Sequence, residues 1–215
     1  MQILIATHNP AKRDELALVF AKFLPTTLTF VTLADVGITQ DVEETGKKFL
    51  ENAILKAETY AHLSGLPTIA DDGGICIEAL HGEPGVHSKR WMGREATDHE
   101  LIAYCLKKLE PFETDKERSA YFEVVLAFCA SSTAVGQQNP FIHTTSARVS
   151  GHIAHTAHKA VIPGFPYRAL MVVDKYHRYY DELTPQQHRE VNHRYMAGQQ
   201  LASAILAWYN RVSRT

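Results

Sequence analysis

The sequence predicts a mixed α/β fold, an elongated mixed sheet with two lobes. Three observations predict it. Over residues 1–70, short apolar runs typical of strands alternate with segments whose apolar residues recur at helical spacing. The middle of the chain is rich in strand-forming residues, and a capped helix closes the sequence. Strands that alternate with helices before a β-rich segment are typical of mixed folds.

The first elements follow from apolar spacing. Residues 2–7 form an apolar run and predict a buried strand. Residues 12–23 carry apolar side chains three and four positions apart, which predicts a helix that Pro25 ends. Residues 28–33 alternate and are rich in Thr and Val, which predicts a second strand.

A second helix and two short strands are expected next. Residues 47–64 have one apolar helical face, and Gly65 provides the end signal. Residues 67–70 predict a short strand that leads into residues 71–74, Asp-Asp-Gly-Gly, where the glycines allow a tight turn and a close approach of the backbone. Residues 75–80 alternate and predict another strand.

The second half of the chain predicts one helix, three strands and a capped final helix. The expected elements are a helix at 98–109, strands at 121–129 and 141–149 joined as an antiparallel pair by residues 131–140, and a strand at 170–173. Thr184 is the expected N-cap of the last helix, with Pro185 at its first position and Gln187 at the capping-box position. This helix, broken or continuous, runs to about Val212.

Composition excludes several classes of protein. The 215 residues are 45% hydrophobic and 21% charged, which is ordinary for a globular protein. With 22 basic and 24 acidic residues, the chain lacks the basic excess of a nucleic-acid binder. No apolar run is long enough to cross a membrane, and the first residues do not resemble a secretion signal. Cys76, Cys105 and Cys129 are widely spaced, which favours reduced core thiols and a cytoplasmic location.

Two stretches are suited to hold phosphates. Residues 7–12 stand where a strand passes into a helix, so free backbone N–H groups and Lys12 favour an anion there. Asn52 and Lys56 are four residues apart and share a helix face, downstream of an acidic turn at 43–46. The alternatives are an ordinary helix start with a surface lysine and a solvated helix face.

The adjacent acids Asp71 and Asp72 are the strongest candidates for a reactive centre. Carboxylates at a strand end suit a hard cation such as Mg²⁺, which prefers oxygen ligands and substrate phosphates. The alternative is an acidic turn. Near the C-terminus, His193 and Arg194 offer hydrogen-bonding groups for a phosphate or a base. A run of three histidines, His152 to His158, favours a polar loop over a metal site.

Taken together and in this order, these stretches resemble the inosine triphosphate pyrophosphatase family, whose members are also described as dITP/XTP pyrophosphatases. The resemblance covers nearly the whole chain. The matching residues are Thr7, Asn9, Lys12, Glu44, Thr45, Gly46, Phe49, Glu51, Asn52, Ala53, Lys56, Ala57, Ala70, Asp71, Asp72, Gly74, Ala79, Leu80, Gly82, Pro84, Gly85, Val86, Ser88, Gly164, Phe165, Tyr167, His193 and Arg194.

The resemblance implies an activity and an architecture. Family members hydrolyse ITP, dITP and XTP to the monophosphate and pyrophosphate with Mg²⁺, which clears these nucleotides from the pool. They are usually homodimers, with an active site in a cleft between two lobes. The resemblance therefore implies that residues 1–215 are a single nucleoside triphosphate pyrophosphatase domain.

The resemblance also implies roles for individual residues. Asp72 would be the general base and a metal ligand, with Glu44 as a second metal-site carboxylate. Asp71 and Asn52 would support them. The remaining assignments are Thr7, Asn9, Lys12 and Lys56 for the triphosphate, and Gly73, Phe165, Tyr167, Arg168, His188, His193 and Arg194 for the base.

The sequence departs from the family pattern at residues that the resemblance assigns to the base and at their neighbours. Arg168 stands where the family has a carboxylate, and His188 stands where it has a lysine. Gly73 and Asn192 each replace a serine. These changes leave two alternatives open, the same chemistry on a different nucleotide and a catalytically silent nucleotide-binding homologue. A dehydrogenase is excluded because no G-x-G-x-x-G follows the first strand.

Overall fold

Seven strands form one mixed sheet in the order β2-β1-β3-β4-β5-β6-β7 in the computed structural model, which describes residues 1–130 and 140–214. Strand β1 pairs in parallel with both β2 and β3, whereas β6 pairs antiparallel with β5 and β7. The mixed α/β prediction is confirmed. The strands are β1 (Gln2–Ala6), β2 (Thr29–Thr32), β3 (Thr68–Ile77), β4 (Ser119–Ala130), β5 (Phe141–Ile153), β6 (Met171–Val173) and β7 (Arg178–Tyr179).

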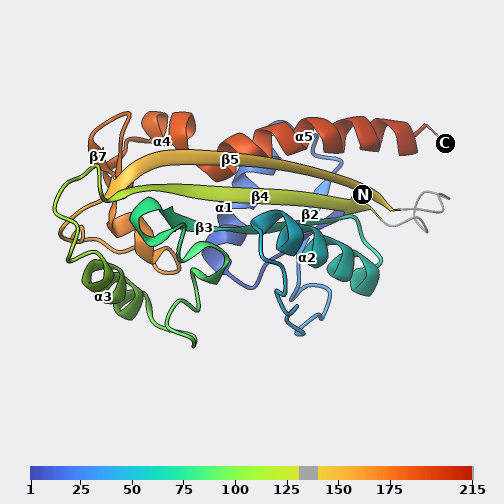
Figure 1. The fold of residues 1–215 in the computed structure, drawn as a ribbon. Coiled ribbons are helices and arrows are strands. Elements are labelled where there is room, and N and C mark those ends of the chain that lie inside the picture. The colour runs from blue at the N-terminus through green and yellow to red at the C-terminus, as the bar shows by residue number, and fades with distance from the viewer. Residues whose placement is uncertain (131–139, 215) are drawn as a thin grey trace. The chain divides into compact units, whose positions relative to one another are not determined.

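The helices fall between and after these strands in the order that the sequence predicts (Figure 1). The α-helices are α1 (Pro10–Phe23), α2 (Phe49–Ser64), α3 (Asp98–Lys108), α4 (Pro185–Val191) and α5 (His193–Val212). Short 3-10 helices lie at Glu78–Leu80, Gly85–His87, Pro166–Ala169 and Tyr180–Glu182. The predicted caps are present: Gly65 ends α2 in the left-handed conformation, and Thr184 and Gln187 form a capping box on α4.

The described residues gather in two compact units. The first comprises Met1–Asp72, Val124–Ala147 and Arg194–Thr215, and the second comprises Gly73–Glu123 and Arg148–His193. This division agrees with the expectation of two lobes. The expected cleft stays a prediction.

The first unit has its core between the strands and the helices α1 and α5. Ile3, Ile69 and Leu126 from the strands pack in one buried cluster with Phe20 of α1 and Trp208 of α5. Helix α2 lies on the other side of these strands from α5 (Figure 1). Four consecutive residues of β1 are buried, because helices cover both faces of the sheet here.

The second unit has its own core. Helix α3 contributes Leu101 and Cys105, which pack against Ile75 and Phe122 of the strands and against Tyr180. Cys76, Cys105 and Cys129 are all free and buried, as predicted.

The main correction concerns β3. The sequence predicts a tight turn at 71–74, but β3 runs without a break from Thr68 to Ile77. The close approach that the glycines also allow is present at Gly74, because a Cβ there would overlap the side chain of Ser88 and the carbonyl oxygen of Gly85. The acidic pair therefore lies inside a strand, which fixes the direction of both side chains.

Smaller differences lie at element ends. Residues 78–80, predicted as strand, form a 3-10 helix, and Asn192 breaks the final helix into α4 and α5. The predicted connection at 131–140 lies almost wholly outside the described residues.

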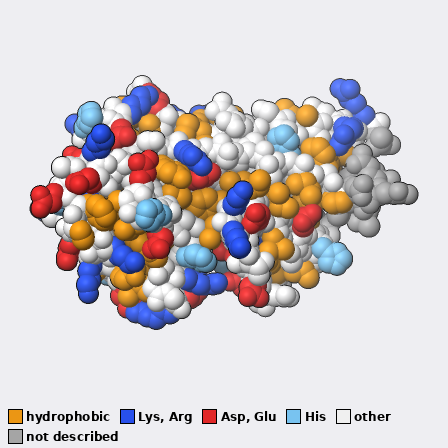
Figure 2. Space-filling view, in the orientation of Figure 1, with side chains coloured by type: hydrophobic (Ala, Val, Ile, Leu, Met, Phe, Trp, Pro, Cys, Tyr) orange, Lys and Arg blue, Asp and Glu red, His pale blue; other side chains and the backbone are white. Residues whose placement is uncertain are grey.

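Charge on the visible face is of mixed sign, with Lys and Arg interspersed among Asp and Glu (Figure 2). No helix among the described residues is long and apolar enough to span a bilayer.

Candidate active site

The start of α1 is built by the side chains that the sequence singles out. Asn9 is the N-cap, and its Oδ1 accepts hydrogen bonds from the backbone N–H groups of Ala11 at 2.9 Å and Lys12 at 3.3 Å. The hydroxyl of Thr7 in turn accepts one from the N–H of Asn9. Pro10 occupies the first helical position, where its missing N–H costs no hydrogen bond. The strand-to-helix turn is thus locked by its own polar residues.

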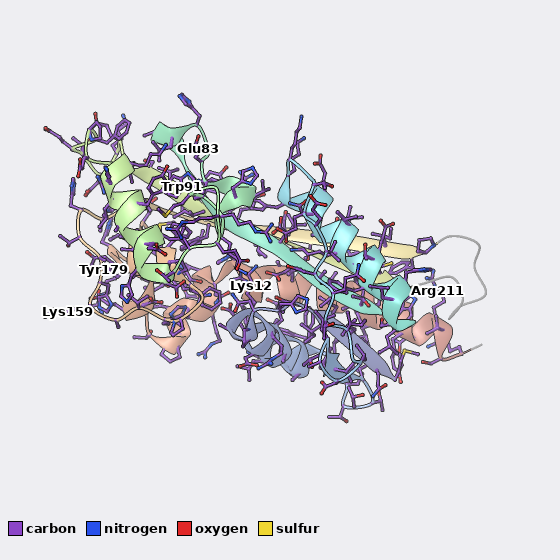
Figure 3. The ribbon with its side chains drawn as sticks, turned by 90° about the horizontal axis from the view of Figure 1, so that it is seen from below. Lys12, Glu83, Trp91, Lys159, Tyr179 and Arg211 are labelled. Carbon is purple, nitrogen blue, oxygen red and sulfur yellow. The ribbon has the colours of Figure 1, made fainter. Side chains whose placement is uncertain are left out.

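Asp71 joins this turn to the far end of the chain. Its Oδ2 lies 3.1 Å from Lys12 Nζ, which projects from the first turn of α1 (labelled in Figure 3), and 3.4 Å from Arg194 Nε on α5. Arg194 also pairs with Glu15 of α1 at 3.4 Å. Three predicted site residues from distant parts of the sequence therefore meet in one buried charge cluster.

Asp72 faces a second cluster, centred on Lys56. The Lys56 ammonium lies 2.6 Å from Glu44 Oε1 and 3.4 Å from Asp72 Oδ1. Asn52 donates from Nδ2 to Asp72 Oδ2 at 3.0 Å. The two predicted metal-site carboxylates thus converge on one cation, and each oxygen of Asp72 has a partner.

Asn52 also holds the acidic loop in place. Its Oδ1 accepts a hydrogen bond from the N–H of Gly46 at 2.8 Å, and a Cβ on Gly46 would collide with the Asn52 side chain. The carboxylate of Glu51 accepts from the N–H of Lys47 at 2.7 Å and from the N–H of Lys48, the N-cap of α2, at 3.3 Å. One amide side chain therefore links the loop of Glu44 to Asp72.

The electrostatics of the adjacent acids differ. Burial opposes ionisation of Asp71, but the charges of Lys12 and Arg194 outweigh it and hold the pKa of that carboxyl well below its usual range. Burial raises the pKa of Asp72, and the charge of Lys56 offsets only part of this effect. Asp71 is therefore a permanent counter-charge, while Asp72 is the better proton acceptor.

Lys56 stays charged despite its burial. Burial alone would lower the pKa of its ammonium, but the charges of Asp72, Asp71 and Glu44 outweigh that effect and raise it. Two carboxylates that already hold a buried cation are ligands of the kind that a divalent metal ion prefers.

The predicted base-contact residues of the second unit divide into two groups. Tyr167 is buried and donates from its hydroxyl to the carbonyl of Ser88 at 2.7 Å. Phe165, Arg168, His188 and His193 are connected by ring contacts to one another or to Tyr180. Gly73 lies in β3. That any of these residues contacts a base stays a prediction.

Sequence reasoning missed Glu15 and Tyr180. Glu15 lies two turns into an ordinary helix, and only its ion pair with Arg194 reveals its place in the cluster. Tyr180 stands in a short polar segment with no motif, although it is fully buried. Its place beside Tyr179 in an otherwise polar stretch was the only available signal.

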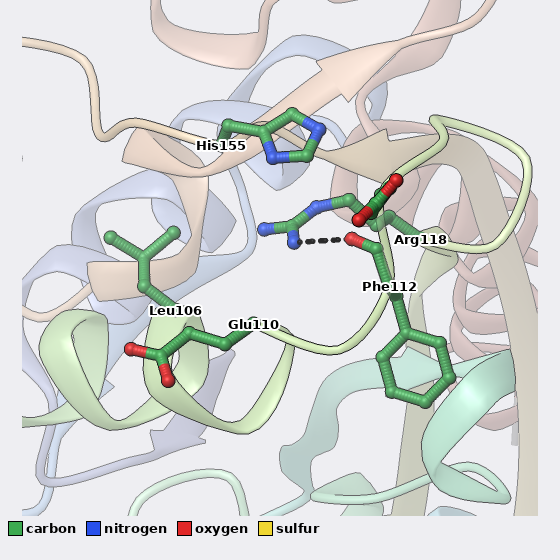
Figure 4. A pocket seen from close by; sticks show the side chains of 6 residues that line it. Leu106, Glu110, Phe112, Arg118 and His155 are labelled. Atoms are coloured by element: carbon green, nitrogen blue, oxygen red, sulfur yellow. Dashed lines mark hydrogen bonds between the residues drawn. The ribbon is translucent and has the colours of Figure 1, made fainter.

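The second unit also contains a pocket of about 340 Å³, lined by Leu106, Glu110, Phe112, Glu113, Arg118 and His155 (Figure 4). The guanidinium of Arg118 donates to four backbone carbonyls, among them that of Phe112 at 3.2 Å. No predicted site residue lines this pocket. Arg118 joins the backbone of residues 109–112 to that of residues 153–154.

The chain matches known proteins over almost its full length. Residues 3–204 match the model of the Ham1 family. A dITP/XTP pyrophosphatase from Erwinia tasmaniensis is 36% identical over 90% of this chain and 88% of its own length. One from Yersinia pestis is 35% identical over 95% of this chain and 98% of its own.

Solved structures show the same likeness. A HAM1 protein from Coxiella burnetii superposes with a TM-score of 0.79 at 33% identity and covers 96% of this chain and 99% of its own. The Ham1 protein of Staphylococcus aureus gives a TM-score of 0.79 at 29% identity, with the same coverage. The resemblance seen in the sequence is confirmed, and the chain belongs to the Ham1 family.

Proposed function

We propose that this chain hydrolyses the triphosphates of deaminated purines, ITP, dITP and XTP, to the monophosphate and pyrophosphate. The names of the relatives that match nearly the whole chain support the substrate class. The observation that carries the proposal is the convergence of Glu44 and Asp72 on Lys56. In this proposal both units serve one pyrophosphatase domain.

The residues fit a divalent metal ion, which we propose is Mg²⁺. Mg²⁺ is usually held by one or two carboxylates together with substrate phosphates. Glu44 and Asp72 already reach one cation between them, so they would supply those carboxylates. When bound, the ion would neutralise charge on the phosphate chain.

Thr7, Asn9, Lys12 and Lys56 are the proposed triphosphate ligands. The N–H groups of Ala11 and Lys12 already bond to Asn9, so the positive end of the α1 dipole is what favours an anion there. Lys12 lies in the same turn and is held in place by Asp71. Two lysines and a helix start suit the four negative charges of a triphosphate.

The proposed chemical step is attack of water on the α-phosphorus. Asp72 takes a proton from the water, whose oxygen bonds to the α-phosphorus. The bond from that phosphorus to the α–β bridging oxygen breaks, and pyrophosphate leaves with the electron pair. Asn52 and Lys56 fix the orientation of Asp72, and the raised pKa of its carboxyl makes it a stronger base than an exposed aspartate.

Gly73, Phe165, Tyr167, Arg168, His188, His193 and Arg194 are the proposed base contacts. Arg168 favours a second candidate function, the same reaction on another nucleotide, because it reverses the charge that the family pattern has at this position. We also propose a homodimer and, given three buried free thiols, a reducing cytoplasmic environment.

Substitution of Asp72 tests the enzyme proposal. Asp72→Asn removes the proton acceptor and keeps the shape, so kcat for ITP should fall by about 10² to 10⁴-fold while nucleotide binding is retained. Asp14→Asn, an exposed change on α1, is the matched control and should leave pyrophosphate release unchanged. If the wild-type protein with Mg²⁺ released no pyrophosphate from any triphosphate, the enzyme proposal would be wrong.

A further inference from the structure

Tyr180 is the centre of the second unit's cluster of charged and ring side chains. Its own ring is fully buried. The guanidinium carbon of Arg168 lies 5.0 Å from its centroid, and the ring of His188 meets it edge-on at 5.0 Å. The ring of His193 lies 6.3 Å away, also edge-on. One phenol ring therefore contacts three of the predicted base-contact residues.

Arg168 is held between two aromatic rings. Its guanidinium carbon lies 3.7 Å from the centroid of Phe165, in addition to its contact with Tyr180. The side chain is nearly buried. Ring contacts from two residues restrict the guanidinium plane, which aims its planar fork of N–H donors in a fixed direction.

Asp181 follows Tyr180 in the same 3-10 helix, and its carboxyl has unusual surroundings. Both carboxyl oxygens are buried, and neither has a hydrogen-bond partner among the described residues. Burial raises the pKa of this carboxyl, and among the charges that oppose the effect Arg168 is the largest, followed by His158. A buried carboxyl without hydrogen bonds is costly and calls for an explanation. Figure 3 labels Tyr179, which directly precedes this pair.

A purely structural role explains this carboxyl poorly. A neutral side chain of similar size would fill the same space without the cost of burying an acid. Tyr180, which directly precedes Asp181, has its ring centroid 5.0 Å from the Arg168 guanidinium carbon. Burial raises the pKa of the Asp181 carboxyl, and the charge of Arg168 lowers it. The carboxyl therefore acts on the guanidinium at a distance, as a counter-charge, and not through a hydrogen bond of its own.

We propose that Asp181 is a positioning residue for Arg168, and that the two together select bases that carry a carbonyl oxygen at purine position 6. This inference rests on the proposed function, because it assumes that the cluster around Tyr180 receives the base. A guanidinium only donates hydrogen bonds, so it matches the O6 and N7 acceptors shared by hypoxanthine, xanthine and guanine. Adenine presents an amino donor at that edge and is disfavoured.

The test combines equilibrium binding with turnover. Binding of IMP and AMP and pyrophosphate release from ITP and ATP are measured for the wild type, Asp181→Asn and the control Glu182→Gln. Glu182 is the next carboxylate in the same 3-10 helix, but it is exposed and pairs with His158 at 3.4 Å. Asp181→Asn should lower the IMP-over-AMP preference about 10-fold, and KM for ITP should rise more than kcat falls. Asp181→Glu should recover part of the preference.

A second variant guards against misfolding of the first. Arg168→Lys keeps the positive charge but loses the planar fork, so it should lose the same preference. The inference is overturned if the wild type shows no IMP-over-AMP preference, if Asp181→Asn or Arg168→Lys keeps it within twofold, or if Glu182→Gln loses it equally. Should the wild type bind IMP selectively yet release no pyrophosphate, the proposed function fails, and the binding ratios still decide the role of Asp181.

Discussion

Lys56 shows how one side chain can serve both stability and chemistry. It is nearly buried, and its ammonium contacts Glu44 and Asp72 from a position four residues after Asn52 on the same face of α2. Helical spacing predicted that Asn52 and Lys56 share one face of the helix. Only the structure shows that this face contacts Glu44 and Asp72. Removal of the lysine would leave two carboxylates close together without their cation.

Lys56→Met should therefore be destabilising as well as inactivating. Breaking a buried ion pair by removing one partner costs about 3 kcal/mol, and kcat should fall at least about 10²-fold. Urea unfolding and pyrophosphate release measure the two effects. Lys47→Met, a change at an exposed lysine just before α2, is the control and should alter neither. An active Lys56→Met protein of wild-type stability would contradict this account.

At the scale of elements, the caps set the boundaries of the helices. In α3 the hydroxyl of Thr97 accepts a hydrogen bond from the N–H of Glu100, and the Glu100 carboxylate accepts from the N–H of Thr97 at 2.8 Å. Arg94 adds an ion pair to the same carboxylate at 2.6 Å. Such local patterns lie within a few residues of one another, which is why helix boundaries were predictable to within a few residues.

The capping box of α3 gives a stability effect that depends on pH. The hydrogen bonds from Arg94 and Thr97 lower the pKa of Glu100 from 4.5 to about 2. Because the folded pKa is depressed, its stabilising contribution is fully present above about pH 4.5 and is lost as the pH falls toward 2. Glu100→Gln should thus lower the thermal midpoint at pH 7, and the gap to the wild type should narrow between pH 4.5 and 2. A gap that stayed constant over this range would rule out this linkage.

Strand β3 shows where element prediction fails. Two glycines after two acids indicate a turn when only neighbours in sequence are considered. In the structure the glycine at 74 makes room for Ser88, fourteen residues away, and the strand continues. A glycine that permits a close approach and one that permits a turn look alike in the sequence, so this correction required the fold.

At the scale of the whole molecule, the order of elements was predictable from apolar periodicity. Motifs with fixed spacing singled out the residues that gather around Asp71 and Asp72. The pairing of Asp71 with Arg194 joins residues 123 positions apart, and no local pattern encodes it. The roles of Tyr180 and Asp181 depend on which side chains surround them. Long-range charge and ring contacts are therefore the part of the site that the sequence left open.

Nucleotide binding should stabilise the folded protein as a whole. A ligand at 100 times its Kd that binds only the folded state adds about 2.7 kcal/mol of stability. Asp72→Asn allows this measurement without turnover, so its thermal midpoint should rise with ITP and Mg²⁺ and rise less with ATP and Mg²⁺. Equal midpoints with and without nucleotide would contradict the proposed binding site.

The ammonium of Lys56 between Glu44 and Asp72 has a consequence for the order of events in turnover. The ammonium offsets one of the two carboxylate charges, so a divalent ion that entered alone would have to compete with Lys56 for these oxygens. The oxygens of a triphosphate would supply further ligands for the ion and a further partner for the lysine. On the proposed function, the ion is therefore expected to bind mainly together with the nucleotide.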